Sequence, residues 1–355
     1  MRQLAADRQA EAVTALAKLG VPQDHATFLG YPDRGLATLW QSNWTASSPY
    51  RSPYTGETAV PNQAARGASR PFCGEGVLEE ATAALRSYRP DHVFYPDPAD
   101  DHPDHWATHC FVQLALERLR GEACLARSER HTYLIHRGEW PDPMRADRSL
   151  NLSPPPALAR QSNRWVSVPL TRENLDAKAA ALRSYRSQEA LAGNFLHAFL
   201  RRNELLIDPP VPERRLAAHP GANQVFADST SDRFPRARCA AIDFTGVEVE
   251  SGESKVKLSA TLRGPVAGWP AYYLYWKPVS GAPGTIQTRR YRITGFRCDP
   301  AAARFAIEGR RLEVIVPRAE LGDSTRIMVA AAAWSGPLLL DRTAWRVVNV
   351  GTERE

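Results

Sequence analysis

The sequence contains few cysteines and no long hydrophobic run. Its five cysteines are scattered, odd in number and free of any Cys-x-x-Cys spacing, so neither a disulfide framework nor a cysteine-based zinc site is indicated. No stretch approaches the roughly 20 apolar residues that a membrane-spanning helix needs. The sequence therefore predicts no membrane span.

Charge of one sign is not concentrated anywhere in the chain. The formal net charge of +6 comes from 45 basic and 39 acidic residues that are dispersed along the sequence. Mixed signs of this kind favour solubility and argue against binding to nucleic acid. The first residues show no signal-peptide pattern, but a signal could have preceded Met1. The sequence therefore does not decide between a cytoplasmic and an exported protein.

At 355 residues, the chain is long enough for two domains. In residues 1–208, helix-patterned runs alternate with short apolar runs, which is typical of an α/β domain. Residues 209–238 are rich in Pro, Gly and Ser, as a linker would be. Residues 239–355 carry period-two runs, such as 255–262, without a helical pattern, and they predict an antiparallel β-sandwich.

Three tryptophans of the second domain allow two interpretations. Trp276, Trp334 and Trp345 could form a platform on which sugars stack, or they could belong to the core. A sandwich fold does not by itself establish glycan binding.

Residues 97–105, Asp-Pro-Ala-Asp-Asp-His-Pro-Asp-His, form a polar cluster that is a candidate functional site. They lie between a strand-like run and a helix-like run. Pro103 suits the first helical position, which places Asp104 and His105 in the first turn and leaves His102 at the loop edge. The two imidazoles and nearby carboxylates predict a metal or proton-transfer site at the carboxyl end of a strand. The alternative is that they only cap the helix and bind its free amides.

Two further residues follow predicted strands. Asp33 lies in the exit turn of a predicted strand over residues 27–30, and it either faces a ligand or only forms the turn. His136 lies near the exit of a predicted strand over residues 131–137, where it either lines the pocket or makes an ordinary hydrogen bond.

A long connection without periodicity covers residues 41–73. Connections of this length are usually lids, binding loops or disordered segments. Its aromatic residues Trp44, Tyr50 and Tyr54 favour a sugar-binding loop, or else they pin the loop to the body of the domain.

The stretch His102-Pro103-Asp104-His105 resembles the His-Pro-Asp-His motif of the PIG-L family, also called LmbE-like, of zinc-dependent N-acetylglucosaminyl deacetylases. Other segments that resemble the family follow in its order: Arg8-Gln9-Ala10-Glu11, Leu19-Gly20-Val21, Phe28-Leu29-Gly30-Tyr31-Pro32-Asp33 and Ala181-Leu182-Arg183-Ser184-Tyr185-Arg186-Ser187-Gln188. The resemblance covers roughly residues 5 to 205. It implies a Rossmann-like, mostly parallel sheet with flanking helices.

The resemblance also implies an activity and a set of site residues. The chain would remove the acetyl group from an N-acetylated amino sugar or glycoconjugate, with Zn2+ as cofactor and His105 as a zinc ligand. His102, oriented by Asp104, would stabilise the oxyanion or protonate the leaving amine. Arg8 and Asp33 match positions that contact the sugar. Asp100 and His136 complete the candidate substrate-binding residues.

The chain departs from the family pattern in one respect. The family's Ala-His-Pro-Asp-Asp-Glu motif, which supplies two zinc ligands and the general base, has no counterpart here, so we expect residues 1–208 to be an N-terminally incomplete domain with impaired or absent activity. Three hypotheses follow: a deacetylase that has lost its first βα unit, a catalytically dead protein that binds glycans, or another metal-dependent hydrolase that uses His102, His105 and His109.

Overall fold

The computed structural model describes residues 2–61, 69–159, 164–208, 223–227, 239–281, 284–301 and 303–351. The chain divides into two compact units, which are described separately: unit 1 contains residues 1–156 and 163–209, and unit 2 contains residues 157–162 and 210–355. Among the described residues, no helix is both long and apolar enough to cross a bilayer.

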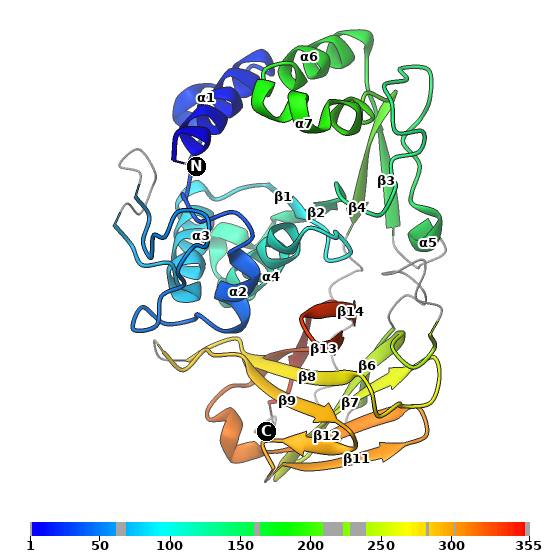
Figure 1. The fold of residues 1–355 in the computed structure, drawn as a ribbon. Coiled ribbons are helices and arrows are strands. Elements are labelled where there is room, and N and C mark those ends of the chain that lie inside the picture. Colours follow the sequence, from blue (N-terminus) through cyan, green and yellow to red (C-terminus); the bar gives the residue numbers. More distant parts are fainter. Residues whose placement is uncertain are drawn as a thin grey trace. The chain divides into compact units, whose positions relative to one another are not determined.

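Unit 1 combines helices with one small sheet (Figure 1). Its helical elements are α1 (Arg2–Lys18), η1 (Gln23–His25), α2 (Leu36–Gln41), α3 (Gly74–Tyr88), α4 (Pro103–Arg118), η2 (Ala123–Leu125), α6 (Arg172–Leu182) and α7 (Arg186–His197), and the short helix α5 (Pro156–Ala159) begins at its boundary. Its strands are β1 (His92–Pro96), β2 (Glu129–Tyr133), β3 (Arg164–Pro169) and β4 (Asn203–Asp208).

The sheet of unit 1 has the strand order β1-β2-β4-β3. Strands β1 and β2 are parallel and are joined through α4, so they form a βαβ unit. The β2–β4 and β3–β4 pairs are both antiparallel. The described sheet is therefore mixed, and the expected mostly parallel order is found in one pair of strands only.

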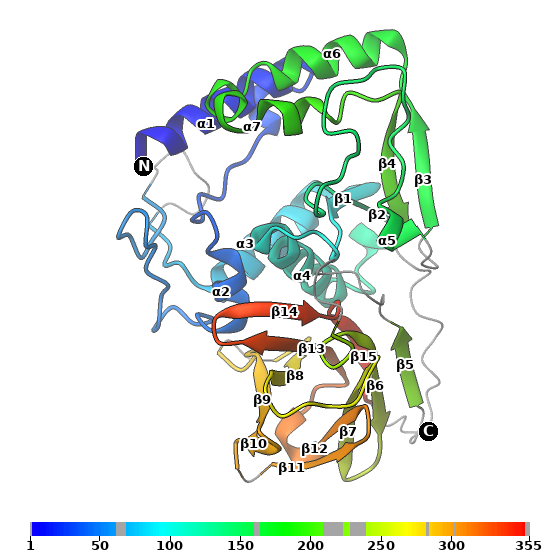
Figure 2. The same ribbon diagram turned by 45° about the vertical axis from the view of Figure 1, so that its right-hand side comes forward.

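The helices of unit 1 form two groups that can be followed in Figures 1 and 2. Helix α1 lies along α6 and α7, whereas α3 and α4 lie side by side and α2 packs on α4. Local sequence explains why α4 starts where it does, since Pro103 occupies its first turn and His102 caps it. Buried α4 residues such as Trp106, Phe111 and Leu114 form its core face.

Two predicted elements of unit 1 differ from the structure. Residues 27–30 form no strand. The spacing of Leu191, Phe195 and Phe199 predicts a helix that ends near Leu206. In the structure this helix, α7, ends at His197, and residues 203–208 form β4 at an interior position of the sheet. A short apolar run such as Leu205–Ile207 fits either a helix or a strand by periodicity alone, and only its pairing with β2 and β3 decides between them.

Unit 2 consists of two antiparallel sheets. The first has the order β10-β9-β8-β13-β14, with β15 beside β13, and the second has the order β11-β12-β7-β6-β5. The bounds are β5 (Asn223–Ala227), β6 (Phe244–Ser251), β7 (Lys255–Leu262), β8 (Ala271–Pro278), β9 (Arg289–Thr294), β10 (Arg297–Asp299), β11 (Arg304–Glu308), β12 (Arg311–Pro317), β13 (Arg326–Ser335), β14 (Leu338–Arg342) and β15 (Arg346–Asn349), with η3 at Arg318–Leu321.

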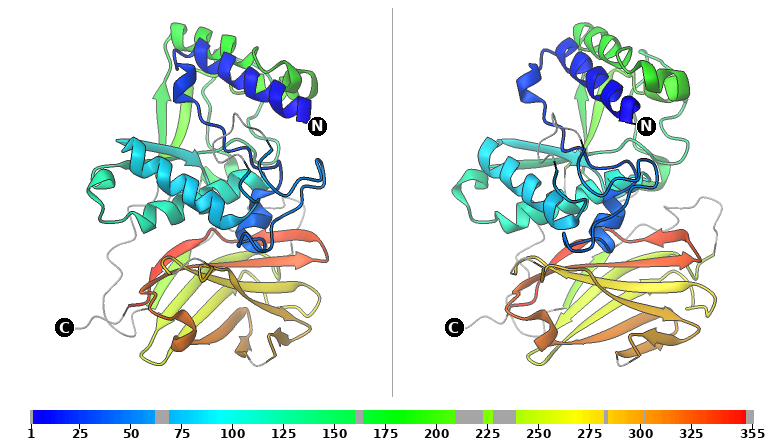
Figure 3. Two further views of the ribbon diagram at one scale, coloured as in Figure 1. Left: turned by 90° about the vertical axis from the view of Figure 1, so that its left-hand side faces the viewer. Right: turned by 60° about the vertical axis from the view of Figure 1, so that its left-hand side comes forward.

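One hydrophobic core joins both sheets of unit 2, which lie over each other in Figure 3. Phe244, Leu258 and Val314 from the second sheet pack with Leu274 and Val329 from the first. The alternating burial of β7 agrees with its period-two sequence. The antiparallel sheets predicted for the C-terminal region are thus present.

The structure decides between the two interpretations of the C-terminal tryptophans. Trp276 and Trp345 are buried in unit 2 and Trp334 is partly exposed, which agrees with a place in the core and not with a stacking platform. Within the predicted linker, Asn223–Ala227 forms β5, which pairs with β6. The remainder of the linker, residues 209–222 and 228–238, lies outside the described residues.

Candidate active site

The loop that follows β1 is fixed to the exit of β2. The Asp97 amide donates to the Tyr133 carbonyl at 2.8 Å, and the Asp97 carboxylate accepts hydrogen bonds from the Thr132 hydroxyl at 2.8 Å and the Ala99 amide at 2.9 Å. The carboxyl ends of β1 and β2 meet here because the two strands are parallel. This edge of the sheet is where an α/β fold places ligand groups.

Asp100 is the buried centre of this loop. Its Oδ1 atom accepts from the His102 amide at 2.9 Å, and its Oδ2 atom accepts from the amides of Ile135 and His136 at 2.9 and 3.0 Å. The side chain is fully buried. Asp100 therefore joins the β1–α4 loop to the segment after β2, and its burial corrects the expectation that it contacts a substrate.

His105 lies against this buried carboxylate. Its Nδ1 atom is 3.1 Å from Asp100 Oδ2, although the ring N–H is not aligned for a straight hydrogen bond. Burial by itself raises the pKa of the Asp100 carboxyl, but the contact with His105 and the amide hydrogen bonds outweigh burial, so the net shift of this pKa is downward. With Nδ1 facing a carboxylate, the other ring nitrogen, Nε2, is the one left for a ligand.

His102 caps helix α4 with its ring. Its Nδ1 atom accepts a hydrogen bond from the Asp104 amide at 3.2 Å, so the side chain does cap the helix, and its Nε2 atom is not used in this contact. The group of Asp104 that orients His102 in this contact is its backbone amide. Burial, together with the neighbouring His105 and His136, lowers the pKa of His102 below its ordinary value.

The Asp104 carboxylate instead holds the turn that carries Asp33. Its oxygens accept hydrogen bonds from the amides of Arg34 at 2.5 Å and Leu36 at 3.0 Å. Arg34 has a φ of +57°, a conformation that a non-glycine residue adopts only when its surroundings hold it. Burial raises the pKa of Asp104 above its ordinary value, more than these two amides lower it.

His136 completes a cluster of three imidazoles. Its ring centroid lies 5.4 Å from that of His102 and 5.2 Å from that of His105, and the rings of His102 and His105 are 4.9 Å apart. The ring of Phe195 stacks on His136 at 5.0 Å with 12° between the planes. The helical spacing of Phe195 in α7 does not by itself predict this partner.

The donor chemistry fits a metal ion in part. His105 presents an imidazole with a buried carboxylate behind it, an arrangement typical of metal-ligating histidines. Donor atoms of Asp33, His102 and Asp104 also lie within 4.8 Å of one another, but Asp104 already accepts two amides and the His102 Nδ1 atom accepts a third. Among the described residues, no set of three close donors contains His105.

Among the described residues, no contact joins Arg8 to the cluster of His102, His105 and His136. Arg8 lies on α1, and its Nε atom is buried with no hydrogen-bond partner in the described part of the chain. The same helix is tied to α7 through Glu11, whose carboxylate accepts from the Ser187 amide at 2.8 Å and the Ser187 hydroxyl at 2.7 Å. Two segments that carry the family resemblance are thus joined in space.

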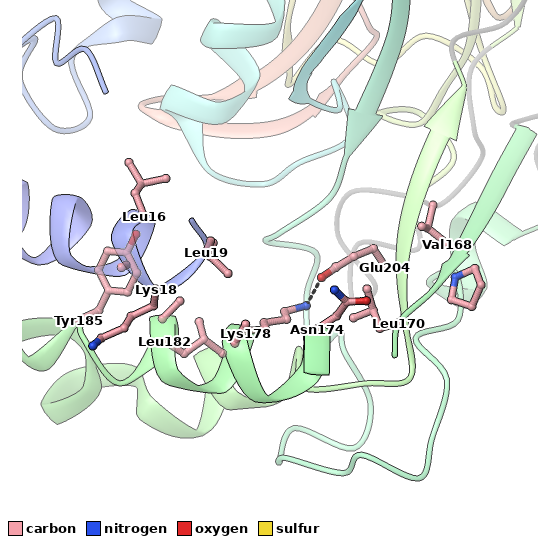
Figure 4. Close-up of a pocket in the computed structure, with 14 residues that line it drawn as sticks. Leu16, Lys18, Leu19, Val168, Leu170, Asn174, Lys178, Leu182, Tyr185 and Glu204 are labelled. Atoms are coloured by element: carbon pink, nitrogen blue, oxygen red, sulfur yellow. Dashed lines mark hydrogen bonds and ion pairs between the residues drawn. The ribbon is translucent and has the colours of Figure 1, made fainter. Parts of the chain in front are cut away.

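A groove of about 610 Å³ lies between α1, α6 and the end of β3 (Figure 4). Its lining is mostly apolar, with Leu16 and Leu182 on the helices, Leu19 directly after α1, and one ion pair, Lys178–Glu204, at 2.5 Å. None of the site residues expected from the sequence lines it. The groove is therefore separate from the histidine cluster.

The aromatic residues of the long connection have different positions. Trp44 is buried, stacks on Phe111 at 6.1 Å and meets Trp40 edge to face at 6.0 Å, so it pins the connection to the body of unit 1. Tyr50 is half-buried and Tyr54 is exposed. The expected role in sugar stacking is therefore excluded for Trp44.

Comparison with known proteins gives one result for the N-terminal part of the chain. No curated protein matches this chain. The family model PIG-L, GlcNAc-PI de-N-acetylase, matches residues 1–116, which contain Asp33, Asp100, His102, Asp104 and His105. The segment 181–188 and His136 lie beyond the matched part. Residues 1–116 are therefore similar to the PIG-L family, and this similarity indicates a deacetylase-type hydrolase.

Proposed function

We propose that the chain is a metal-dependent hydrolase that removes the acetyl group from an N-acetylated amino sugar or glycoconjugate, with residues 1–208 as the deacetylase domain and residues 239–355 as an accessory β-sandwich. The observation that carries the proposal is the His105–Asp100 pair beside His102 and His136, within or next to the segment that matches the family. We further propose that the βαβ unit of β1, α4 and β2 belongs to a Rossmann-like sheet.

His105 is the proposed ligand for the cation, and zinc is the cation that a deacetylase of this family would use. When bound, the cation would lower the pKa of a water molecule and polarise the amide carbonyl. Asp100 fixes the His105 ring from the buried side, so that Nε2 is the donor atom. The remaining ligands are not assigned to residues of this chain.

His102 is proposed to stabilise the oxyanion. Its Nδ1 atom accepts the Asp104 amide, so in the neutral ring the proton resides on Nε2. An Nε2–H group is a hydrogen-bond donor of the type that stabilises negative charge on a carbonyl oxygen during acyl transfer. Asp104 acts as a positioning residue, because its amide orients His102 and its carboxylate holds the turn of Asp33, which we propose contacts the sugar.

Substrate contact is also proposed for His136 and, from the family resemblance alone, for Arg8. His136 is held by its amide on Asp100 and by the Phe195 ring, which leaves the imidazole in a fixed orientation beside the other two. For Arg8 the described structure adds no contact with the cluster, so its role rests on the resemblance.

The proposal is tested by acetate release from N-acetylglucosaminides in the presence of Zn2+. His102→Ala is expected to lower kcat by about 10²–10³-fold, as for loss of one oxyanion donor, and His105→Ala is expected to abolish release together with one bound zinc. His25→Ala removes an exposed imidazole outside the site and serves as matched control. Because activity of this chain is expected to be impaired, bound zinc is measured beside acetate release. Equal zinc content and equal acetate release in all three variants would contradict the proposal.

The alternative function is non-catalytic glycan binding through the C-terminal unit. One observation favours it: Trp269 and Phe296 are 55% and 58% exposed, and the Gly295 amide donates to the Gly268 carbonyl, so the two aromatics lie on neighbouring turns. Binding of N-acetylglucosamine oligomers that is lost in Trp269→Ala, without acetate release by the parent chain, would support this alternative.

A further inference from the structure

A second group of metal-ligating side chains lies at the amino ends of β1 and β2. Side chains at the amino end of a parallel pair lie at the opposite edge of the sheet from the histidine cluster, which follows the carboxyl ends. His92 pairs in register with Glu129, and His131 follows Glu129 by two residues. Residues paired across strands and residues two apart along a strand share one face of a sheet, so these three side chains lie on the same face.

We infer that His92, Glu129 and His131 form a second binding site for a divalent transition-metal cation, with Zn2+ as the ion of matching chemistry. Two imidazoles and one carboxylate are a known set of zinc ligands, and three protein ligands leave a fourth position for water. The site is distinct from the proposed hydrolytic site.

The separations between the donor atoms match the edges of a zinc coordination tetrahedron. His92 Nδ1 lies 3.2 Å from His131 Nε2, and each of these nitrogens lies 3.6 Å from Glu129 Oε2. Zinc bonds of about 2.0–2.2 Å at tetrahedral angles place neighbouring ligand atoms roughly 3.3–3.6 Å apart. The three donors are therefore close to the arrangement that the cation requires, and little movement is needed.

Asp208 supplies an independent reason to assign the site. Its Oδ1 atom lies 3.1 Å from His131 Nδ1. This contact places the proton of the neutral His131 ring on Nδ1, so the lone pair on Nε2 is free to bind a cation. Histidines that ligate metals commonly have a carboxylate in this position behind the ring. The position of Asp208 follows from the fold. Strand β4 runs antiparallel to β2 with Thr132 opposite Ile207, and the next residue of β4, Asp208, therefore lies beside His131.

The surroundings of the site restrain the two rings while keeping them accessible. The Phe94 ring stacks on His131 at 4.9 Å with 23° between the planes, and it lies 6.2 Å from the His92 ring. The side chain of His131 is 16% exposed, against 53% for His92 and 67% for Glu129. A cation can therefore reach the site from solvent, and the more buried ligand is the one that Asp208 orients.

The experiment uses the full chain with His105→Ala, so that the proposed hydrolytic site contributes no zinc. Equilibrium dialysis against Zn2+ alone is expected to give one bound ion per chain, and zinc is expected to raise the melting temperature in a concentration-dependent way. Added His92→Ala or His131→Ala should remove that ion, and Asp208→Asn should weaken its binding about 10–100-fold. His25→Ala is the matched surface control and should leave binding unchanged.

Two results would overturn the inference. One is a His105→Ala chain that binds no zinc, in which case the 3.2 Å contact is only a hydrogen bond between two imidazoles. The other is a bound ion that survives both His92→Ala and His131→Ala. His92 is an exposed residue, so its variant is expected to fold, and the melting temperature without zinc verifies this.

Discussion

The carboxylate of Asp100, which is fully buried, lies 3.1 Å from the Nδ1 atom of His105. This pair joins the end of β1 to the first turn of α4, and the same carboxylate accepts amides from the segment after β2. One side chain therefore fixes both the backbone of the loop and the ring of the proposed metal ligand.

Asp100→Asn is expected to lower zinc affinity and acetate release about 10–100-fold, the usual effect of changing a residue behind a metal ligand. The substitution keeps the size of the side chain but removes its charge and turns one acceptor into a donor that faces backbone amides. Asp101→Asn is the matched control, because the Asp101 carboxylate accepts hydrogen bonds from Arg137 and the Gly138 amide. Equal effects of the two substitutions would show that Asp100 has no special relation to His105.

Asp104→Ala is expected to reduce the free energy of unfolding by about 1–3 kcal/mol, because the amides of Arg34 and Leu36 lose their charged acceptor. Urea denaturation measures this change. The turn at Arg34 should also relax from its positive φ, so KM for an N-acetylglucosaminide should rise through the displacement of Asp33. Thr108→Val removes another hydrogen bond of the same helix and should alter stability without altering KM.

Glu11→Ala is expected to lower the free energy of unfolding by about 1–3 kcal/mol, since the Ser187 amide and hydroxyl both lose their acceptor. Ser187→Ala removes only the hydroxyl contact and should cost less. A double-mutant cycle of the two positions isolates their interaction. A coupling energy near zero would mean that this contact does not hold α1 to α7.

The stability of the metal-free chain is expected to fall as the pH decreases from 7 through 6.5. Burial lowers the pKa of His136 more than the Asp100 carboxylate raises it, so this pKa is lower in the folded chain than in the unfolded chain. At a pH between the two values the unfolded chain binds more protons, and lowering the pH therefore favours unfolding. Urea denaturation in the presence of a chelator measures the slope. His136→Gln should flatten part of this slope, and His102, whose pKa burial also lowers, contributes to the remainder.

The start of α4 could be predicted because it depends on local chemistry: Pro103 and His102 determine where this helix begins. The approach of Asp33 to His102 and Asp104 could not be predicted in this way, because it joins two segments that are far apart in the sequence. What each carboxylate does was not predicted either, because Asp100 and Asp104 accept hydrogen bonds from amides that are 35 to 70 residues distant in the chain.

The sequence by itself determined the helices α1, α3, α4 and α6 of unit 1 and the period-two strands of unit 2 such as β7, because these periods are set by which residues must be buried. Only the tertiary structure decided that residues 203–208 form a strand inside the sheet and that His92, Glu129 and His131 meet on one face. The physical reason is strand pairing. Register between distant segments decides which side chains become neighbours, and hydrophobic periodicity carries no information about that register.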